Sequence, residues 1–478
     1  VAGKIIMDSE RCIECSRCIR FCREFIGRDI FGFTKRGSKT EISVYPGGDN
    51  DSNYLLNVVD GCPVGALTEK AFRFQMRTWF LKATKSICAE SSAGVNTRVW
   101  SREGKIYRIT PRRNQAVNET WMSDSGRYIY RRFEPKNRLS VPRIDSSPCE
   151  LQYAVDRCME IMKLGNIAIV ANAWQTVEEQ FVIAELAKAC GAKVHMVSHL
   201  GEDDGKLVSA DRTPNMRGAF VTGLIKEYPK PDLRELAESV RAGEVKTVLC
   251  FRENIAELGF EPKDFKSANI IYCGALENST SQIAKICIPM RGEFEKYGMW
   301  INRQFRIQRF EKAVEAPKWV HFGIGNIFRV FIGGIADGLL EQGLLDRGIT
   351  CVETFDYDVV DKIYRPYDNL GLQVILNPDG TRDVRVLGSF AEAVKAQYTD
   401  VAQWARLKEI FRAPSLQLVS FTITEKGYAL KNPDGSWLGY VAADIAGGPD
   451  RAVGAMGVLT AMLHERFRAG GTPVALVS

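Results

Sequence analysis

The sequence predicts a multidomain α/β protein: a cysteine-rich N-terminal module, a small β-rich module and a doubly wound parallel α/β domain. Three observations lead to this prediction. Cysteines cluster near the N-terminus, short alternating segments follow them, and from about residue 150 apolar strands alternate with helical stretches. At 478 residues the chain is too long for one ordinary core, so we expect about two to four domains.

The composition is that of a soluble globular protein, with 45% hydrophobic and 26% charged residues. The net charge of +6 is too small over this length to indicate a nucleic-acid partner. The longest apolar stretch, Ile324–Leu340, is interrupted by Arg329 and Asp337, so we expect no membrane span. No signal peptide is recognisable. Because the chain opens on Val1, almost directly at the cysteines, we expect further residues upstream.

The N-terminal cysteines have the spacing of an iron–sulfur site. Cys12, Cys15 and Cys18 stand three apart, and Cys62 follows far downstream with a proline after it. Four thiolates arranged as C-x2-C-x2-C plus a remote C-P are what a [4Fe–4S] cluster needs. We therefore predict that these four cysteines hold one [4Fe–4S] cluster in a ferredoxin-like domain, residues 1–78.

Other interpretations of the cysteines fit less well. Zinc sites usually pair two C-x2-C units, which a run of three does not provide. Thirteen cysteines are sparse and odd in number, which disfavours a disulfide framework and favours a reducing compartment. Cys22 extends the run to the bacterial ferredoxin pattern, whose fourth cysteine serves a second cluster. Since no second run follows, we predict that Cys22 is a buried non-ligand, with substitution for a ligand as the alternative.

Residues 79–148 are predicted to form the β-rich module. Thr97–Trp100 and Lys105–Thr110 are short alternating runs around the turn Arg102-Glu103-Gly104, which predicts a hairpin. Arg131–Pro148 is basic and marked by prolines, as is typical of a connector.

Residues 149–320 are predicted to form the parallel α/β domain. Val177–Cys190 has apolar residues at helical spacing, and Gly191 is its expected cap. The largely apolar runs predicted to be strands are Asn166–Val170, Lys193–Val197, Val245–Phe251, Asn269–Cys273 and Ile283–Pro289. The strand order cannot be deduced from these runs.

Residues 321–478 form a C-terminal extension whose role the sequence leaves open. Val320–Leu345 is predicted to be helical in part. Phe421–Val441 is predicted to hold two strands around the turn Asn432–Gly435. Arg451–Arg468 is predicted to be a terminal helix.

Other motifs point to little chemistry. His195 and His199 stand four apart, but the first lies in a predicted strand, so a metal site is disfavoured against an ordinary structural role. No G-x-G-x-x-G follows a predicted strand, so we predict no NAD site. No P-loop or nucleophile elbow is present.

Several motifs together resemble one family. They are RCIECSRCIRFC, RGSKTEI, GCPVGALTEKAFRFQMRTW, ADRTPNMRGA and GMWINRQFRIQRFEKA. Residues 4–320 resemble the family of the large iron–sulfur subunit of NADH-quinone oxidoreductase, respiratory complex I, whereas residues 320–478 resemble it weakly. The resemblance implies a molybdopterin-oxidoreductase-like α/β fold, and it matches the four cysteines to the family's all-cysteine cluster on the main electron chain.

The resemblance also implies which clusters are missing. Bacterial relatives often carry a further cluster, and its matching positions here are Cys88, Ser91, Val95 and Ser123. One thiol, two hydroxyls and an aliphatic side chain do not hold a cluster, so we predict that this site is empty. The family's [2Fe–2S] cluster and its histidine-plus-three-cysteine [4Fe–4S] cluster would lie only on residues before Val1 or on another chain.

Two further stretches resemble the pterin-binding region of the superfamily. In Ala210–Asn215, we expect Asp211 and Arg212 to pair locally and the end of the stretch to form a turn, in place of contact with a pterin phosphate. In Gly298–Gln308, Asn302 is expected to be structural as well. The resemblance implies a scaffold without molybdopterin.

The surroundings of the cluster are expected to tune its potential. Four arginines near the ligands either face the cluster or pair with neighbouring glutamates, and both alternatives stay open; they are Arg11, Arg17, Arg20 and Arg23, beside Glu10, Glu14 and Glu24. Four apolar side chains are expected to exclude water: Ile13, Ile19, Val64 and Leu67.

The expected function is electron relay. As the resemblance implies, the chain would be a peripheral subunit of NADH:quinone oxidoreductase on the cytoplasmic side of the inner membrane, passing single electrons from the NADH and flavin side toward quinone. It would have no substrate active site of its own. Its partners would be the flavoprotein NADH-binding subunit and other iron–sulfur subunits. The alternatives are an electron-transfer subunit of an NAD-linked hydrogenase, a formate dehydrogenase chain and, if iron is absent, a scaffold.

Overall fold

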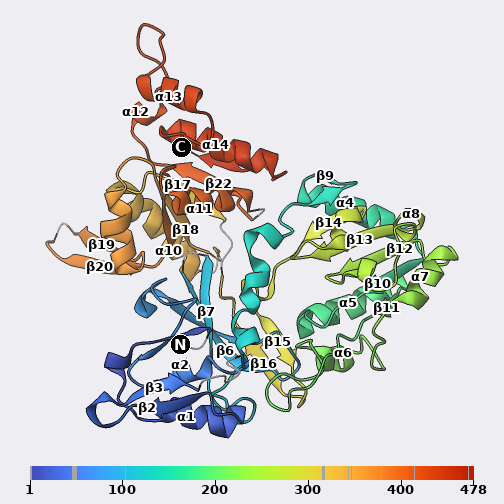
Figure 1. Ribbon diagram of the computed structural model, residues 1–478. Helices are drawn as coiled ribbons and strands as arrows, with labels where there is room; N and C mark the ends of the chain where they lie inside the picture. The colour runs from blue at the N-terminus through green and yellow to red at the C-terminus, as the bar shows by residue number, and fades with distance from the viewer. Residues whose placement is uncertain are drawn as a thin grey trace. The chain divides into compact units, whose positions relative to one another are not determined.

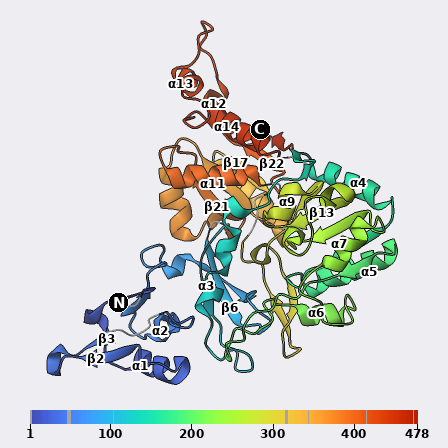
Figure 2. The ribbon, with the colours of Figure 1, turned by 45° about the vertical axis from the view of Figure 1, so that its right-hand side comes forward.

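A computed structural model describes most of the chain, and Figures 1 and 2 show its ribbon from two directions. The described residues are 3–45, 51–102, 104–314, 318–342, 344–345, 347–377, 379–413, 415–471 and 473–477. The chain forms two compact units. Unit 1 consists of Val1–Asn137, Gly165–Ala268 and Arg291–Val314, and unit 2 of Arg138–Leu164, Asn269–Met290 and Glu315–Ser478.

The N-terminal part of unit 1 contains two small antiparallel pairs, β1 with β4 and β2 with β3. Its strands are β1 (Ile5–Met7), β2 (Phe31–Thr34), β3 (Glu41–Val44) and β4 (Leu67–Glu69). Its helical segments are η1 (Ser9–Arg11), α1 (Arg17–Phe21), η2 (Cys22–Ile26), η3 (Gly37–Lys39) and α2 (Asn57–Gly61). The register places Met7 opposite Leu67, so the chain leaving β1 and the chain entering β4 lie side by side. These two stretches carry the predicted cysteine ligands.

A three-stranded antiparallel sheet follows, in the order β5-β6-β7. Its elements are η4 (Thr78–Phe80), β5 (Lys82–Ile87), β6 (Asn96–Arg102), β7 (Lys105–Pro111), α3 (Asp124–Arg127), η5 (Ile129–Phe133) and η6 (Pro135–Asn137). The predicted hairpin is confirmed, with Arg102 opposite Lys105 and Gly104 at a φ of 73°. Glu103 of the predicted turn lies outside the described residues.

The rest of unit 1 is α/β. Three parallel strands lie in the order β11-β10-β12, and β15 pairs antiparallel with β16. The strands are β10 (Ile167–Val170), β11 (Lys193–His195), β12 (Thr247–Phe251), β15 (Gly298–Ile301) and β16 (Ile307–Phe310). The helices are α5 (Val177–Cys190), α6 (Met216–Val221), α7 (Arg234–Arg241), η7 (Ile255–Glu257), α8 (Asp264–Ser267) and η8 (Glu293–Glu295).

Helix α5 has the predicted bounds because both of its ends are capped. The Thr176 hydroxyl accepts from the Glu179 N–H, and the Glu179 carboxylate accepts from the Thr176 N–H, which forms a capping box. Gly191 ends the helix at a φ of 62°, a left-handed conformation that glycine adopts without steric cost. The strand before this helix, β10, is buried at all four residues, as expected of a central parallel strand.

Unit 2 contains two groups of strands. In the first, β13 is parallel to β14, which pairs antiparallel with β8, and β8 with β9. The elements are β8 (Arg143–Ile144), β9 (Ser147–Pro148), α4 (Leu151–Met162), β13 (Asn269–Gly274), α9 (Ser279–Ile283) and β14 (Ile286–Pro289). The predicted parallel α/β character is therefore present in both units. A specific relation to molybdopterin oxidoreductases stays a prediction, as do the four domain boundaries.

The second group is a parallel five-stranded sheet in the order β21-β18-β17-β22-β23, with a separate antiparallel hairpin, β19-β20. The strands are β17 (Trp319–Phe322), β18 (Ile349–Glu353), β19 (Gly371–Leu376), β20 (Arg382–Leu387), β21 (Phe390–Lys395), β22 (Leu418–Phe421) and β23 (Ala475–Val477). The helical segments are η9 (Phe328–Ile332), α10 (Gly333–Glu341), η10 (Val360–Tyr364), η11 (Arg365–Tyr367), α11 (Val401–Arg412), α12 (Glu425–Tyr428), α13 (Gly439–Gly447) and α14 (Ala455–Arg468).

The C-terminal predictions are confirmed in part. Val320–Leu345 is partly helical, and the terminal helix begins at Ala455. The two strands predicted in Phe421–Val441 are wrong: β22 ends where this segment starts, and the regular elements in the rest are α12 and the first residues of α13. The predicted turn is present, but the residues on its two sides pair through one isolated antiparallel bridge, between Lys431 and Trp437. A strand needs a continuous hydrogen-bonded neighbour, and this segment finds none beyond that bridge among the described residues.

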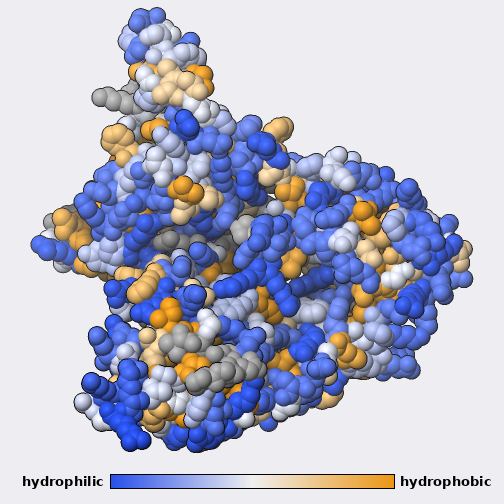
Figure 3. Space-filling model, in the orientation of Figure 1, coloured by the Kyte–Doolittle hydropathy of each residue, from blue (hydrophilic) through white to orange (hydrophobic). Residues whose placement is uncertain are grey.

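The visible face of the molecule is mostly hydrophilic, with apolar residues in small patches (Figure 3). This agrees with the charged content of 26%. Among the described residues, no helix combines the length and apolar character that crossing a bilayer requires.

Candidate iron–sulfur site

The four predicted ligands come together. Cys12, Cys15, Cys18 and Cys62 all line one small cavity in unit 1. Apart from Arg17, the other lining residues are apolar: Met7, Ile13, Ile42, Val64, Ala66 and Leu67. The structure therefore gathers residues that are 50 positions apart in the chain (Cys12 to Cys62) around a common space.

The first three cysteines reach the cavity because the backbone between them turns sharply. Glu14 and Ser16 have φ values of 55° and 58°, in the left-handed region that non-glycine residues seldom adopt. The Glu14 backbone N–H points to the Cys12 sulfur, 3.4 Å away. Such N–H groups stabilise negative charge on a sulfur ligand. Strained backbone of this kind is common where a loop is shaped around a ligand.

Cys62 is positioned by a helix end. It caps α2 in an extended conformation, with a φ of −77° and a ψ of 113°, and Pro63 cannot continue the helix. Gly65 follows at a φ of 65° and turns the chain into β4. The pairing of β1 with β4 then holds this return stretch against the stretch that leads to Cys12.

The protonation of Cys18 reflects its neighbours. Burial, with a smaller contribution from the negative charges of Cys12 and Cys15, raises the pKa of the Cys18 thiol to about 11. The three sulfurs therefore lie within electrostatic reach of one another. Since a metal ligand must be the thiolate, binding of iron here has to release a proton from Cys18.

The donor set fits a four-iron cluster. Each iron of such a cluster takes one cysteine thiolate, so four thiolates around one cavity are the required number. Among the described residues, no group of three or more His, Cys, Asp or Glu side chains was found that could hold a single metal ion. A four-iron cluster is wider than one ion, so its ligands stand further apart than those of zinc.

Cys22 lies outside the cavity lining. Its side chain is fully buried and packs in the core with Cys18, Ile19 and Phe21. Burial, with a smaller contribution from the Cys18 charge, raises the pKa of the Cys22 thiol to about 12. A protonated, buried thiol is chemically inert.

The arginines near the ligands differ in their surroundings. Arg17 lines the cavity. Arg11 pairs with Asp8 at 3.1 Å, and Arg23 pairs with Asp29 at 2.8 Å. Neither of these two cations uses the glutamate partners that the sequence suggested. Arg17 is the cation best placed to act on the charge of the site.

Of the four apolar residues expected to exclude water, two are buried and two are exposed. Ile19 and Leu67 are buried, at 8% and 3% exposure. Ile13 and Val64 line the cavity but are 60% and 37% exposed. They form an apolar rim on the outer side of the cysteine loop.

The second, degenerate site has a different character. The Cys88 N–H donates to the Val95 carbonyl at 2.8 Å. A Cβ atom added to Gly126 would stand 2.8 Å from both the Cys88 sulfur and the Ser123 hydroxyl. Cys88, Val95 and Ser123, three of the four predicted positions, are therefore neighbours in space. The sequence analysis missed Glu90, whose carboxylate accepts a short hydrogen bond from Ser123.

Every polar group of this second site already has a task in the protein. Ser123 caps α3 by accepting from the Gly126 N–H at 3.2 Å, and Ser91 accepts from the Ser209 N–H at 3.3 Å. Burial, with a smaller contribution from the Glu90 charge, raises the pKa of the Cys88 thiol to about 12. A protonated thiol and committed hydroxyls do not fit an iron–sulfur cluster.

The stretches that resemble the pterin-binding region support the fold. Asp211 accepts from the N–H and the hydroxyl of Thr213, at 3.0 and 2.6 Å. The buried Asn215 accepts from the Ile301 N–H at 2.8 Å. Asn302 donates to the Ala93 carbonyl at 3.2 Å. The Asn215 bond joins the two stretches to each other, and the Asn302 bond joins the second stretch to the degenerate loop, within unit 1.

The histidines have structural partners. His199 contacts Glu253 at 3.1 Å and packs edge-on against Trp174. Burial lowers the pKa of His195 to about 4. His195 is the last residue of β11, so this strand ends two residues before the predicted end at Val197.

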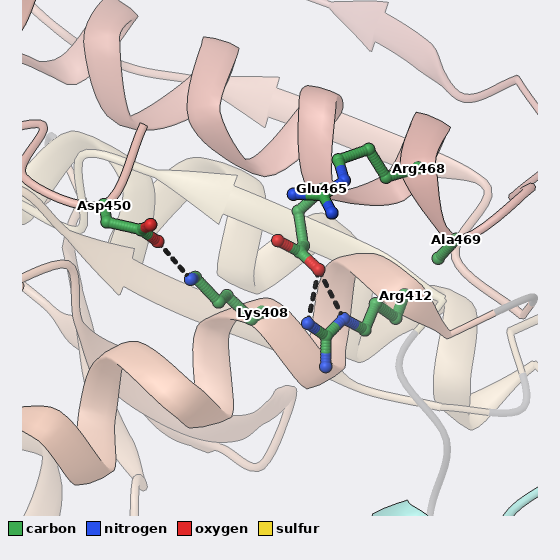
Figure 4. A pocket seen from close by; sticks show the side chains of 6 residues that line it. All are labelled: Lys408, Arg412, Asp450, Glu465, Arg468 and Ala469. Atoms are coloured by element: carbon green, nitrogen blue, oxygen red, sulfur yellow. Dashed lines mark hydrogen bonds and ion pairs between the residues drawn. The ribbon is translucent and has the colours of Figure 1, made fainter. Parts of the chain in front are cut away.

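A larger hollow, of about 400 Å³, lies in unit 2 between α11 and α14. Its charged side chains face one another (Figure 4). Lys408 pairs with Asp450 at 2.5 Å, and Arg412 pairs with Glu465. The hollow is an ion-paired surface and offers no set of converging ligands.

Comparison with protein families places two iron–sulfur domains in unit 1. Residues 3–68 match the family described as NADH-quinone oxidoreductase subunit 3, ferredoxin-like domain. Residues 81–131 match the family described as NADH-ubiquinone oxidoreductase NDSU1/NuoG-like, 4Fe-4S domain.

Individual relatives are of two kinds. The mitochondrial NADH dehydrogenase (ubiquinone) iron–sulfur protein 1 of Solanum tuberosum is 36% identical over 186 residues, 39% of this chain and 24% of that protein. D-mannonate oxidoreductase of Thermotoga maritima is 47% identical over 192 residues, 40% of this chain and 35% of that protein. A crystal structure of substrate-free D-sorbitol dehydrogenase matches 34% of each chain at 27% identity and a TM-score of 0.30. The matched part thus spans about a third or less of the length of each relative.

The matches confirm, for the N-terminal part, the resemblance inferred from the cysteine spacing and its flanking motifs. Residues 3–68 and 81–131 carry iron–sulfur domains of the type found in the large iron–sulfur subunit of NADH-quinone oxidoreductase.

Proposed function

We propose that this chain relays single electrons within an NADH:quinone oxidoreductase of the complex I type, through one [4Fe–4S] cluster held by Cys12, Cys15, Cys18 and Cys62. One observation carries the proposal. The four thiols line a common cavity inside the segment that matches a ferredoxin-like domain.

The protein's own groups would bind and tune the site. A bound [4Fe–4S] cluster supplies reversible one-electron chemistry. The Glu14 N–H stabilises charge on the Cys12 sulfur, and Arg17 favours the more negative, reduced state. Burial by Ile19 and Leu67 acts in the opposite direction, because a lower dielectric penalises added charge.

The proposal also states that three features are absent from this chain. The site of Cys88, Ser91, Val95 and Ser123 holds no cluster, the α/β region holds no molybdopterin, and the cluster relay needs no substrate site on this chain. The first rests on the committed hydroxyls and the protonated thiol described above. The second rests on the structural hydrogen bonds of Asp211 and Asn302.

The partners proposed are the flavoprotein NADH-binding subunit and other iron–sulfur subunits, at the cytoplasmic side of the inner membrane. The exposed apolar rim of Ile13 and Val64 suits contact with such a subunit. An NAD-linked hydrogenase or formate dehydrogenase complex would use the same relay, and the identity of co-purifying subunits distinguishes them.

The test is iron and acid-labile sulfide per chain, with EPR spectroscopy after reduction. The ligand count predicts about four of each and one [4Fe–4S] signal. About eight of each would show that the second site is loaded. A chain that binds no iron after anaerobic reconstitution would leave only a scaffold role.

A second candidate function is oxidation of a sugar acid such as D-mannonate with a nicotinamide dinucleotide as acceptor. The 47% identity to D-mannonate oxidoreductase favours it. The test is the appearance of NADH absorbance when the full chain is mixed with D-mannonate and NAD⁺. No NADH at any substrate concentration would contradict this candidate.

A further inference from the structure

The segment that joins the cysteine module to the three-stranded sheet carries only basic charge. Most of it lies between the two family matches, which end at residue 68 and resume at residue 81. The nearest carboxylate in the chain, Glu69, accepts from the Tyr128 hydroxyl at 2.6 Å. Among the described residues, no ion pair is formed by the four cations of the segment, Lys70, Arg73, Arg77 and Lys82. This unbalanced charge is complementary to an acidic partner.

Two aromatic side chains of the same segment stand in solvent. Phe74 is 91% exposed and Trp79 is 67% exposed. Phe74 also has a φ of 63°, a left-handed conformation that is unfavourable for a bulky residue. The backbone therefore bears a cost to present a ring that finds little packing within the chain. Strained backbone and exposed apolar groups of this kind point to an interaction site.

An arginine lies over each of these rings. The Arg73 guanidinium carbon is 4.8 Å from the centroid of the Phe74 ring. The Arg77 guanidinium carbon is 5.4 Å from the centroid of the Trp79 ring. A ring beneath a guanidinium restricts the arginine side chain while its in-plane N–H groups stay available. Less side-chain entropy is then lost when the guanidinium binds a carboxylate through two hydrogen bonds.

The segment is anchored to the neighbouring sheet. Arg102, on β6, donates to the Phe80 carbonyl at 3.2 Å and lies over the Phe80 ring. Arg108, on β7, lies over the Phe72 ring, 4.4 Å from its centroid. The two exposed arginine–aromatic pairs are therefore presented by a segment whose other aromatic rings are fixed.

The position of the arginines distinguishes between kinds of partner. Single-stranded nucleic acid stacks its bases on open ring faces, and aromatic residues enter a membrane interface as neutral groups. Here a cation covers one face of each ring. A base would find only the other face, and an inserted ring would carry the guanidinium toward hydrocarbon at a large cost. Aromatic residues and arginine together are enriched in protein–protein interfaces.

We propose that residues 70–82 dock an acidic segment of a partner protein, with its carboxylates at Arg73 and Arg77 and its apolar side chains against Phe74 and Trp79. The proposal does not rest on the cluster relay, because this segment contains none of the four cysteines. Failure of docking and failure of cluster assembly are therefore separate results.

The test uses the full chain and a random copolymer of glutamate and tyrosine, which carries carboxylates and rings on a polypeptide. Fluorescence anisotropy of the labelled copolymer measures the binding. We expect saturable binding that weakens with added salt and is tighter than that of polyglutamate of equal length, because the copolymer also contacts the rings. Absence of saturable binding, or equal binding of polyglutamate, would overturn the proposal.

Two further probes separate the classes of partner. They are oligodeoxythymidine of matched charge and vesicles of phosphatidylcholine and phosphatidylserine in equal parts. We expect both to bind more weakly than the copolymer. Tighter binding of the oligonucleotide would assign the surface to nucleic acid, and tighter binding of the vesicles would assign it to a membrane. Either result contradicts a protein partner.

Variants locate the surface. Arg73→Gln combined with Arg77→Gln should weaken copolymer binding at least about tenfold, because two charge-assisted contacts are lost. The matched control, Arg36→Gln with Arg113→Gln, removes the same charge from exposed arginines of unit 1 that lie over no ring among the described residues. This control should bind nearly as the unmodified chain does. Equal weakening in both would show that net charge alone governs binding and would contradict the proposal.

Phe74→Gly provides a result that a folding failure does not explain. Glycine adopts the φ of 63° without steric cost, so the stability toward urea should not fall, whereas loss of the ring should weaken copolymer binding about fivefold or more. Unchanged binding would contradict the role of the ring. A clear loss of stability would show that Phe74 serves the fold. Iron per chain should stay that of the unmodified chain, because Phe74 lies outside the cysteine cavity, and a fall would assign the segment to cluster support.

Discussion

At the scale of residues, the candidate cluster site depends on a few backbone conformations. Glu14 and Ser16 adopt left-handed φ values between the cysteines, and this brings Cys12, Cys15 and Cys18 to one cavity. A helix would have placed residues three apart along a single face, with no room for a common ligand inside. The loop conformation is therefore as important as the spacing.

Replacement of one ligand should destroy the cluster, whereas replacement of its buried neighbour should not. For Cys15→Ser we expect loss of the [4Fe–4S] EPR signal and iron well below about four per chain, because a hydroxyl is a poor soft ligand. Cys22→Ser is the matched control, since that thiol lies outside the cavity, and its iron content should stay at about four. Loss of iron in both variants would show that Cys22 is a ligand.

The degenerate site makes the opposite prediction. Cys88→Ala should leave the iron and sulfide content unchanged, because that thiol is protonated and its neighbours Ser91 and Ser123 are bonded within the protein. Elemental analysis of the reconstituted chain measures this. Iron falling by half would reveal a second cluster.

At the scale of elements, buried polar groups join neighbouring strands. In unit 2, the fully buried His321 on β17 contacts the hydroxyls of Ser420 and Thr422, at 2.7 and 2.9 Å. Since Thr422 donates its proton to the Gly323 carbonyl, the His321 Nε2–H is the donor to Thr422, and Nδ1 accepts from Ser420. A neutral imidazole therefore fastens β17 to β22 beside Gly323.

His321 should make the stability depend on pH. Burial lowers its pKa from 6.5 to about 3. Between these values the unfolded chain takes up a proton that the folded chain does not. The free energy of unfolding should then be highest above about pH 6.5 and fall as the pH drops toward 3, by at most about 1.4 kcal/mol per pH unit.

Urea unfolding at a series of pH values measures this dependence. In the His321→Gln variant the side chain keeps a donor and an acceptor but does not titrate. The free energy of unfolding of this variant should therefore fall less steeply with decreasing pH than that of the unmodified chain. The buried His195 in unit 1 acts in the same direction and is unchanged in both chains, so the difference between the two slopes isolates His321. Identical slopes would mean that His321 does not remain neutral.

The capped start of α5 should contribute measurably to the stability of unit 1. Thr176→Ala removes the hydroxyl that accepts from the Glu179 N–H at 3.1 Å, and we expect a loss of about 1 kcal/mol in the free energy of unfolding. Thr176→Ser keeps the cap and should lose less. Chemical denaturation compares the two, and equal losses would point to lost methyl packing instead.

At the scale of the whole molecule, the two units differ in what they contain. Unit 1 carries the iron–sulfur domain matches, and unit 2 carries a parallel sheet in the 3-2-1-4-5 order. A reductive titration of the reconstituted protein should take up about one electron per chain, because one [4Fe–4S] cluster changes by one electron. Uptake of about two would contradict the empty second site.

Local patterns were enough to predict many features. The capped helix Val177–Cys190 and the hairpin at Gly104 were both predicted, because each depends on residues close together in the chain. The cysteine spacing predicted four ligands from one chemical requirement, and the four thiols line a common cavity. The apolar strands near Val170, Phe251 and Cys273 were found for the same reason.

The sequence by itself determined the cysteine spacing from which the ligand set is predicted, and the short elements that contain their own caps and turns. Only the tertiary structure decided the strand order of the unit 2 sheet, the meeting of Gly323 with Thr422, and the contact of Glu90 with Ser123. The physical reason is the distance along the chain between the residues that interact. A thiolate or a cap acts on its own neighbours, whereas strand pairing and a glycine's close approach depend on segments that folding brings together from far apart in the chain.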